Sequence, residues 1–211
     1  MKEFEFIILF FILLNTVFYL NLNFFAKKIN VFDTPDKKRK IHKIKIPSIG
    51  GVIFILNILL YLFLDNLLNL SSNNNINLEY LILTLFAIFI LGFCDDKFDL
   101  NSNLKLILFI VIITIYFLLN KNQLIQELRF SSLNQYIQLD SLSLIFTVLS
   151  IVIFINAFNM YDGINGQSGL YTITIFLFFI YKSHFIILSI IIIICTIFFL
   201  VNNLKNKIFL G

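Results

Sequence analysis

The sequence predicts an all-α, polytopic membrane protein: a transmembrane helix bundle of about seven spans with its N-terminus outside. Of the 211 residues, 59% are hydrophobic and only 13% are charged. The mean hydropathy is +0.93, far above that of ordinary soluble domains. Several apolar runs approach the roughly 20 residues that cross a bilayer. Because backbone amides in lipid must be paired internally, each run is predicted to be helical.

Seven apolar runs account for the predicted spans. They are residues 4–25, 49–65, 79–94, 104–120, 142–158, 169–181 and 185–201. The sixth run is short for a full crossing, so we expect it to be tilted, broken or partly re-entrant. The first run lacks a small-residue cleavage site, which predicts a retained helix and not a signal peptide. With no soluble segment in the sequence, residues 1–211 form one predicted membrane domain.

The distribution of basic residues predicts the orientation. Twelve of the 16 Lys and Arg residues fall on one side of the predicted spans. Basic loops mark the cytoplasmic face, so this charge argues for topology and against a nucleic-acid partner. The predicted cytoplasmic segments are 26–48, 95–103, 159–168 and 202–211. The predicted outer loops, 66–78 and 121–141, are rich in Asn, Ser and Gln and are expected to be solvated connectors.

A cluster of carboxylates stands at the end of the third span. The apolar run Leu81–Phe93 leads directly into Asp95, Asp96 and Asp99. Charges beside hydrocarbon are costly, which favours a functional role over a solvated helix cap. Carboxylate oxygens at this spacing suit Mg²⁺ or Mn²⁺, or one carboxylate could act as a base. Lys105 follows closely and is either a phosphate-binding group or a snorkelling interfacial lysine.

A second polar cluster follows the fifth span. Asn156, Asn159 and Asp162 are spaced three residues apart, which places them on one face of a helix end. Gly163 and Gly166 then permit close approach of the backbone to a ligand. Such groups could form a nucleotide or metal pocket, and the alternative is an ordinary turn with a helix cap.

The first cytoplasmic loop carries most of the basic charge. The stretch Asp33–His42 is explained by topology, and a landing site for a phosphorylated lipid is the functional alternative. His42 alone is weak evidence. The pair Gly50–Gly51 predicts close packing at the start of the second span. Cys94 and Cys195 are predicted to be small apolar fillers without a disulfide or metal role.

Taken in order, these motifs resemble the polyprenyl-phosphate N-acetylhexosamine-1-phosphate transferase family (glycosyltransferase family 4). The matching segments are Asp33-Thr34-Pro35 with the stretch through His42, Pro47–Gly51, Leu91–Leu100, Asn156–Gly166 and Lys207–Gly211. The acidic motif is more similar to the enzymes that initiate O-antigen, lipopolysaccharide and teichoic-acid synthesis than to the enzyme that makes lipid I.

The resemblance implies transfer of a HexNAc 1-phosphate from a UDP-sugar such as UDP-GlcNAc to undecaprenyl phosphate. It implies a Mg²⁺-assisted reaction at the cytoplasmic face of the bacterial inner membrane, with Mn²⁺ as an alternative. The implied catalytic residues are Asp95, Asp96 and Asp99, and the implied metal ligand is Asn159. The implied substrate-binding residues are Lys105 as a phosphate contact, His42, and Asn156, Asp162 and Asn165 in the nucleotide-sugar pocket.

Two features depart from the family pattern. Asn165 stands where many bacterial members have Asp. The sequence ends at Gly211, where the family continues with a metal-binding Asp, so we expect an N-terminal part that is inactive or nearly so by itself. A non-catalytic remnant and a lipid or solute transporter are the alternatives. Transporters place polar groups at mid-span, whereas here they gather at the predicted cytoplasmic ends. The sequence leaves a homodimer open.

Overall fold

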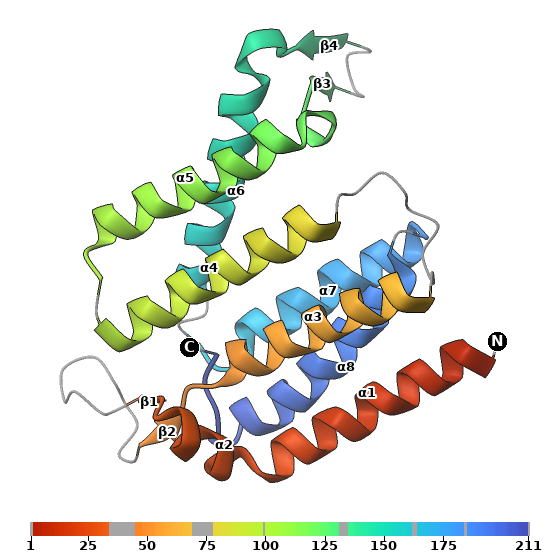
Figure 1. The fold of residues 1–211 in the computed structure, drawn as a ribbon, viewed down its shortest axis with the longest axis vertical. Coiled ribbons are helices and arrows are strands. Elements are labelled where there is room, and N and C mark those ends of the chain that lie inside the picture. Colours follow the sequence, from red (N-terminus) through yellow and green to blue (C-terminus); the bar gives the residue numbers. More distant parts are fainter. Residues whose placement is uncertain are drawn as a thin grey trace. The chain divides into compact units, whose positions relative to one another are not determined.

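The structure, a computed structural model, describes residues 2–33, 45–68, 78–98, 100–130, 135–161, 164–183 and 185–210. The chain divides into two compact units (Figure 1). Unit 1 combines Met1–Ser72 with Tyr161–Gly211, and unit 2 is Asn73–Met160. Every predicted apolar run coincides with helix, which confirms the all-α class.

Unit 1 is built around helix α8. Its elements are α1 (Lys2–Leu20), α2 (Leu22–Ile29), β1 (Phe32–Asp33), β2 (Ile46–Pro47), α3 (Gly50–Leu68), α7 (Gln167–Tyr181) and α8 (Ile186–Asn203). Helix α8 packs against α1, α3 and α7 (Figure 1). Cys195 and Phe199 of α8 are buried in a core with Tyr19 and Ile53. Cys195 is a free, fully buried thiol, as predicted for an apolar filler.

The first predicted span is not one straight helix. α1 ends at Leu20 and α2 begins at Leu22, with a bend of 72° between them. Asn21 lies at the break and interrupts the apolar sequence. Its side-chain amide donates a hydrogen bond to the carbonyl of Val17. Helix α2 is amphipathic and carries both of its lysines in its last turn. The predicted span over 4–25 therefore corresponds to a bent pair of helices, which together are long and apolar enough for one broken span.

Unit 2 is a three-helix arrangement with a β-hairpin at one end. Its elements are α4 (Leu78–Phe98), α5 (Ser102–Leu119), η1 (Lys121–Gln123), β3 (Glu127–Phe130), β4 (Gln135–Gln138), η2 (Asp140–Leu142) and α6 (Ser143–Tyr161). Residues of α5 and α6 form its core, with Leu81 and Ile88 of α4 packed against them. Burial of such side chains contributes about 25 cal/mol per Å² of apolar area removed from water.

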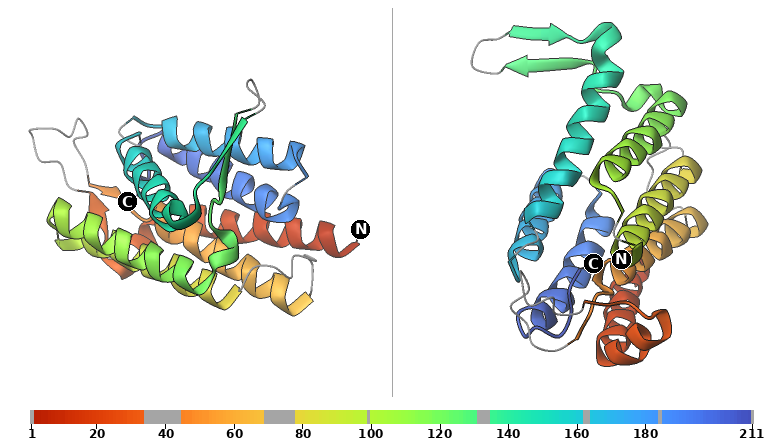
Figure 2. Two further views of the ribbon diagram at one scale, coloured as in Figure 1. Left: turned by 90° about the horizontal axis from the view of Figure 1, so that it is seen from above. Right: turned by 90° about the vertical axis from the view of Figure 1, so that its left-hand side faces the viewer.

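The segment between α5 and α6 is more ordered than a solvated connector. β3 and β4 pair antiparallel from Glu127 opposite Gln138 to Phe130 opposite Gln135. Figure 2 shows this ribbon projecting beyond the start of α6. Polar and apolar residues alternate along β3 (Glu-Leu-Arg-Phe), which is the period of a strand, whereas β4 (Gln-Tyr-Ile-Gln) does not alternate. The segment 121–141, predicted to be a solvated connector, thus contains a largely exposed hairpin within its described residues.

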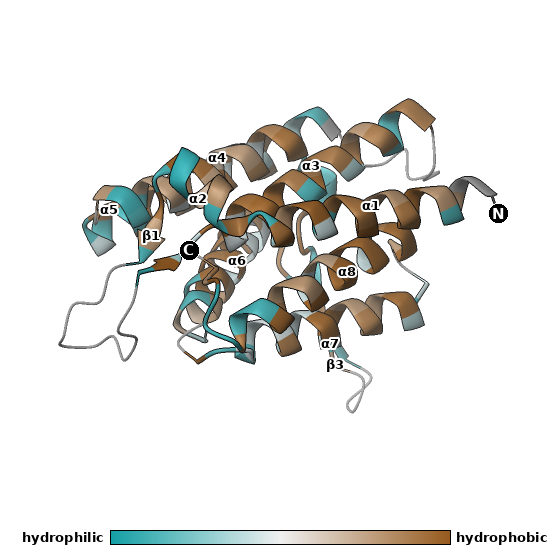
Figure 3. Cartoon of the chain, turned by 90° about the horizontal axis from the view of Figure 1, so that it is seen from below, coloured by the Kyte–Doolittle hydropathy of each residue, from teal (hydrophilic) through white to brown (hydrophobic). Residues whose placement is uncertain are grey.

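Apolar side chains remain exposed along the helices, as expected of a protein in lipid. Figure 3 shows hydrophobic colour over most of the helical surface and hydrophilic colour mainly at helix ends. Among the described helices, four are long and apolar enough to cross a membrane, or five if the bent pair counts as one span. Helix α7 is shorter, in keeping with the predicted short sixth run. The chain is a multi-pass membrane protein.

Close packing at the start of α3 involves an extended segment. A Cβ on Gly50 would lie 2.8 Å from the carbonyl oxygen of Phe209. The amide of Gly50 donates to Phe209 (3.1 Å), and that of Gly51 donates to the carbonyl of Leu210. These bonds satisfy amides that have no partner within the helix. The predicted tight packing is confirmed, and the closest partner is the C-terminal segment.

Candidate functional site

An ion pair joins two of the predicted site residues within unit 2. Lys105, in the first turn of α5, donates from Nζ to a carboxylate oxygen of Asp95, in the last turn of α4. Each side chain is only 23% exposed, so the pair is partly shielded from solvent. The short link after α4 folds α5 back antiparallel to it. That reversal, and not helical periodicity, brings the two residues together.

The position of Asp95 and Asp96 in α4 is electrostatically unfavourable. Both carboxylates lie near the C-terminus of the helix, which ends at Phe98. The dipole there repels anions at a cost of about 0.3–1 kcal/mol for an exposed group. The next helix begins at a different cap, because the side chain of Asn101 accepts the bond from the amide of Asn103. The helix dipole therefore disfavours the two carboxylates where they stand at the end of α4.

Two amides from α6 lie at the same end of unit 2. α4 ends, α5 begins and α6 ends there, because the hairpin returns the chain antiparallel to α5. Asn156 and Asn159 lie one turn apart on α6, and both are exposed. The predicted helical stacking of these two residues is confirmed. Asp95, Lys105 and the two amides thus occur at one end of the same unit.

The oxygen donors at this end suit a hard divalent cation. Among the described residues, no three His, Cys, Asp or Glu side chains lie close enough together to hold a metal ion. Asp96 adds an exposed carboxylate to the amide oxygens of Asn156 and Asn159. Mg²⁺ binds such groups with one or two protein carboxylates and completes its shell with water and substrate phosphate. The donor set is compatible with Mg²⁺ bound together with a diphosphate.

Asn165 belongs to unit 1, in the turn that precedes α7. Its side-chain amide donates to Oδ1 of Asn206 over 2.6 Å. The next residue, Gly166, has φ of +83°, a left-handed conformation that favours glycine. The amide of Gly166 donates to Oδ1 of Asn203 over 2.7 Å, and Nδ2 of Asn203 donates to the carbonyl of Ile208 over 2.9 Å.

One buried side chain therefore joins two of the recognised motifs. Asn203 is 4% exposed and bonds both the turn at Gly166 and the C-terminal segment at Ile208. Neither Asn203 nor Asn206 was among the predicted site residues. The feature that could have indicated them is a set of asparagines between an apolar run and the motif Lys207–Gly211. Three further predicted site residues, Asp99, Asp162 and His42, lie outside the described residues.

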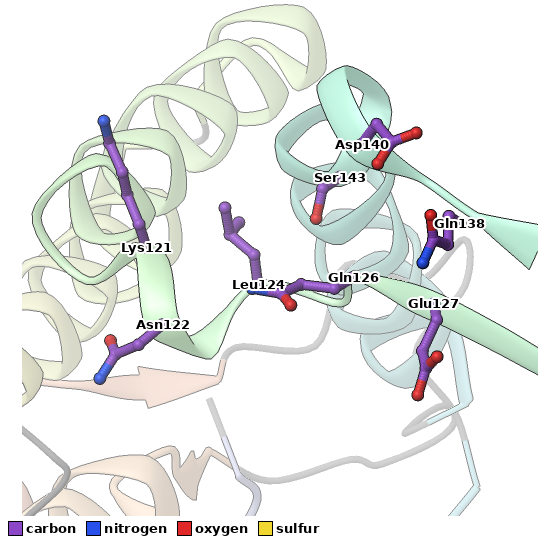
Figure 4. Close-up of a pocket in the computed structure, with 8 residues that line it drawn as sticks. All are labelled: Lys121, Asn122, Leu124, Gln126, Glu127, Gln138, Asp140 and Ser143. Carbon is purple, nitrogen blue, oxygen red and sulfur yellow. The ribbon is translucent and has the colours of Figure 1, made fainter.

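A polar pocket of about 670 Å³ lies at the other end of unit 2. Figure 4 shows Lys121 and Asn122 on the segment after α5, and Asp140 and Ser143 where α6 begins. Lys105 lies 14 residues before the end of α5 at Leu119, so at 1.5 Å per residue this pocket is roughly 21 Å along the helix from Lys105. It is therefore separate from the candidate site.

Unit 1 also contains polar residues in the middle of apolar helices. Asn15 of α1 and Asn57 of α3 are fully buried, and Nδ2 of Asn15 donates to Oδ1 of Asn57 over 2.8 Å. Each amide also donates to a carbonyl one turn earlier, at Phe11 and Ile53. The expectation that polar groups avoid mid-span positions is therefore wrong. Because these amides satisfy each other, they stabilise helix packing.

Comparison with known proteins shows the family of this chain. The family model "Glycosyl transferase family 4" matches residues 78–211. A phospho-N-acetylmuramoyl-pentapeptide-transferase of Prochlorococcus marinus is 30% identical over 155 residues, covering 68% of this chain and 42% of the relative. An undecaprenyl-phosphate alpha-N-acetylglucosaminyl 1-phosphate transferase of Thermotoga maritima is 31% identical over 145 residues, covering 69% and 41%.

A third relative matches a longer part of the chain. A probable undecaprenyl-phosphate N-acetylglucosaminyl 1-phosphate transferase of Bacillus subtilis is 28% identical over 196 residues, covering 88% of this chain and 52% of the relative. The chain thus spans about half the length of the curated relatives it matches, or somewhat less. The family match includes the ion pair, the amides of α6 and the turn at Asn165. The chain belongs to glycosyl transferase family 4.

Proposed function

We propose that this chain is part of a membrane phosphotransferase that moves a sugar 1-phosphate from a UDP-sugar to undecaprenyl phosphate. The main observation is the partly buried ion pair of Asp95 and Lys105 in unit 2, whose helix α6 also carries the exposed amides of Asn156 and Asn159. An anionic acceptor needs a cation at a membrane boundary, and a diphosphate donor needs hydrogen-bonding groups and a metal. One end of unit 2 offers groups of these kinds.

The reaction conserves charge and atoms without a covalent protein intermediate. An oxygen of the lipid phosphate attacks the sugar-bound phosphorus of the UDP-sugar, and a new diphosphate bond forms. The bond from that phosphorus to the oxygen of UMP breaks, and UMP leaves. Such transfers depend mainly on positioning and on stabilising negative charge.

Each described residue has a role in this proposal. The ammonium of Lys105 exchanges part of its contact with Asp95 for an oxygen of the lipid phosphate, which places the nucleophile. Asp95 accepts a proton if the lipid phosphate arrives as a monoanion. Asn159 and Asp96 would hold Mg²⁺, which supplies neutralisation of the diphosphate charge when it is bound. Asn156 contributes its amide to the nucleotide-sugar pocket.

The donor is proposed to be a UDP-N-acetylhexosamine, with UDP-GlcNAc as the first candidate. Two of the three relatives are named for N-acetylglucosaminyl 1-phosphate transfer, and one for a phospho-N-acetylmuramoyl-pentapeptide. We further propose that the reaction takes place on the cytoplasmic side of the plasma membrane. The segments predicted to lie on that side contain 12 of the 16 Lys and Arg residues, and such an excess of basic residues is typical of cytoplasmic loops.

The test uses membranes that contain the complete gene product, with radiolabelled UDP-GlcNAc, undecaprenyl phosphate and Mg²⁺. We expect labelled lipid in organic extracts, and about 10²-fold or greater loss of rate for Asp95→Asn and Asn159→Ala. Glu127→Gln, in the hairpin of the same unit, is the matched control and should retain the rate. If no UDP-N-acetylhexosamine, including the muramoyl-pentapeptide form, yields labelled lipid, the proposal is wrong.

A further inference from the structure

A second cavity, of about 510 Å³, lies within unit 1, and we call it the junction pocket. Three segments line it: the bend between α1 and α2, strand β2, and the end of α8 with the residues after it. None of its lining residues belongs to the site proposed for sugar-phosphate transfer. Ligand binding in the junction pocket therefore does not depend on the proposed function.

The polar side of the junction pocket is basic. Lys45 precedes β2, and Lys207 follows the turn after α8; both line the pocket and both are exposed. Within the described part of the chain, neither ammonium forms an ion pair with a carboxylate. Asparagine amides lie between them, at Asn202 and Asn206 among others, and no Asp or Glu contributes to the lining. This chemistry favours an anion.

Apolar side chains that are open to the surroundings also line the junction pocket. Leu20 and Phe24 line the pocket on either side of the bend and are 79% and 64% exposed. Ile46, which is buried, forms part of the floor. Exposed apolar side chains beside a basic pocket match a ligand with an anionic head and a hydrocarbon tail. A soluble anion such as a nucleotide would leave them in water.

The bend places this pocket where a headgroup would be found. α1 is apolar, whereas α2 turns away by 72° and carries Lys27 and Lys28 in its last turn. A short amphipathic helix with terminal lysines is typical of the membrane interface. Basic pockets between helices on the cytoplasmic side bind anionic headgroups.

We propose that the junction pocket binds the phosphodiester headgroup of an anionic phospholipid. Lys45 and Lys207 contact the phosphate, and Leu20 and Phe24 contact the upper acyl chain. Each interfacial lysine is worth about fivefold in affinity for an anionic lipid, so removing both should weaken binding by about 25-fold.

The test is a titration of the purified full chain with phosphatidylglycerol in zwitterionic detergent, with bound lipid counted by native mass spectrometry. The double variant Lys45→Gln/Lys207→Gln should bind about 25-fold more weakly. The control Lys182→Gln/Lys205→Gln removes the same charge from unit 1, outside the pocket lining, and should bind within twofold of wild type. Thermal unfolding of each variant establishes that it is folded.

Four outcomes would overturn the proposal. Equal losses in both double variants would show that only overall charge attracts the lipid. Binding of phosphatidylcholine as tight as that of phosphatidylglycerol would exclude headgroup recognition. Competition by inorganic phosphate, or tighter binding of undecaprenyl phosphate that depends on Lys45 and Lys207, would assign the pocket to a free phosphate or to the acceptor lipid.

Discussion

Replacing Asn203 by leucine removes the two hydrogen bonds that join the turn before α7 to the C-terminal segment. The side chain is 4% exposed, and its bonds to the amide of Gly166 and the carbonyl of Ile208 measure 2.7 and 2.9 Å. A buried polar group left without a partner costs about 1–3 kcal/mol. Two such groups cost about 2–6 kcal/mol, and the added apolar burial offsets about 1–2 kcal/mol of this, which leaves a net loss of about 0–5 kcal/mol with a midpoint near 2.5 kcal/mol.

Hydrogen exchange measured by mass spectrometry on the full chain in detergent separates this local effect from general destabilisation. A loss of about 2 kcal/mol in local stability should accelerate exchange about 30-fold in peptides that contain Gly166 and Phe209. Phe209 is informative because its amide donates to the carbonyl of Pro47 over 2.9 Å.

Asn57→Leu is the matched control, because it removes a buried amide from the same unit without touching either segment. Asn57→Leu should lower the overall stability of the chain. The exchange rates of the two peptides, relative to those of other peptides of unit 1, should be the same as in wild type. Unchanged exchange at Gly166 and Phe209 in Asn203→Leu would refute the reasoning.

Two other close contacts are tested by substitutions at Gly50 and Thr147, with Gly92 as the control for Gly50. Gly50→Ala should destabilise unit 1 by more than 1 kcal/mol in denaturant unfolding, because its Cβ would lie 2.8 Å from the oxygen of Phe209. Gly92→Ala has no heavy atom within 4 Å of the new Cβ and should be neutral or stabilising; equal behaviour of both variants would contradict the structure. Thr147→Val should raise amide exchange at Ile125, whose N–H donates to Oγ1 of Thr147 over 3.0 Å. Protection of that amide in the variant would show that the bond does not hold the hairpin to α6.

The helices and the chemical character of the site were predictable from local patterns. An apolar run of spanning length has no stable alternative to helix in lipid, so hydropathy located all seven runs. Asn156 and Asn159 are on one helix, and their shared face follows from a spacing of three residues. Asp95 and Asp96 stood out because carboxylates are costly at a span end.

Features that depend on contacts distant in sequence were not predictable. Polar and apolar residues alternate in β3, yet the polar composition of the segment 121–141 indicated only a connector. The bend at Asn21 depends on the packing of α2 in unit 1, where Leu22 and Ala26 are buried. Asn15 and Asn57 are 42 residues apart, and a hydropathy profile carries no signal that they are paired.

The sequence by itself determined the membrane class, the helical segments and the identity of the polar groups, because backbone pairing and transfer from water depend on composition within one run. Only the tertiary structure decided which polar groups meet. Asp95 binds Lys105 because α5 reverses on α4, and Asn203 bonds Gly166 and Ile208 because α8 brings two segments to its end. Hydrogen bonds and ion pairs require atoms within about 3 Å, and that proximity is set by packing between helices, which no local pattern encodes.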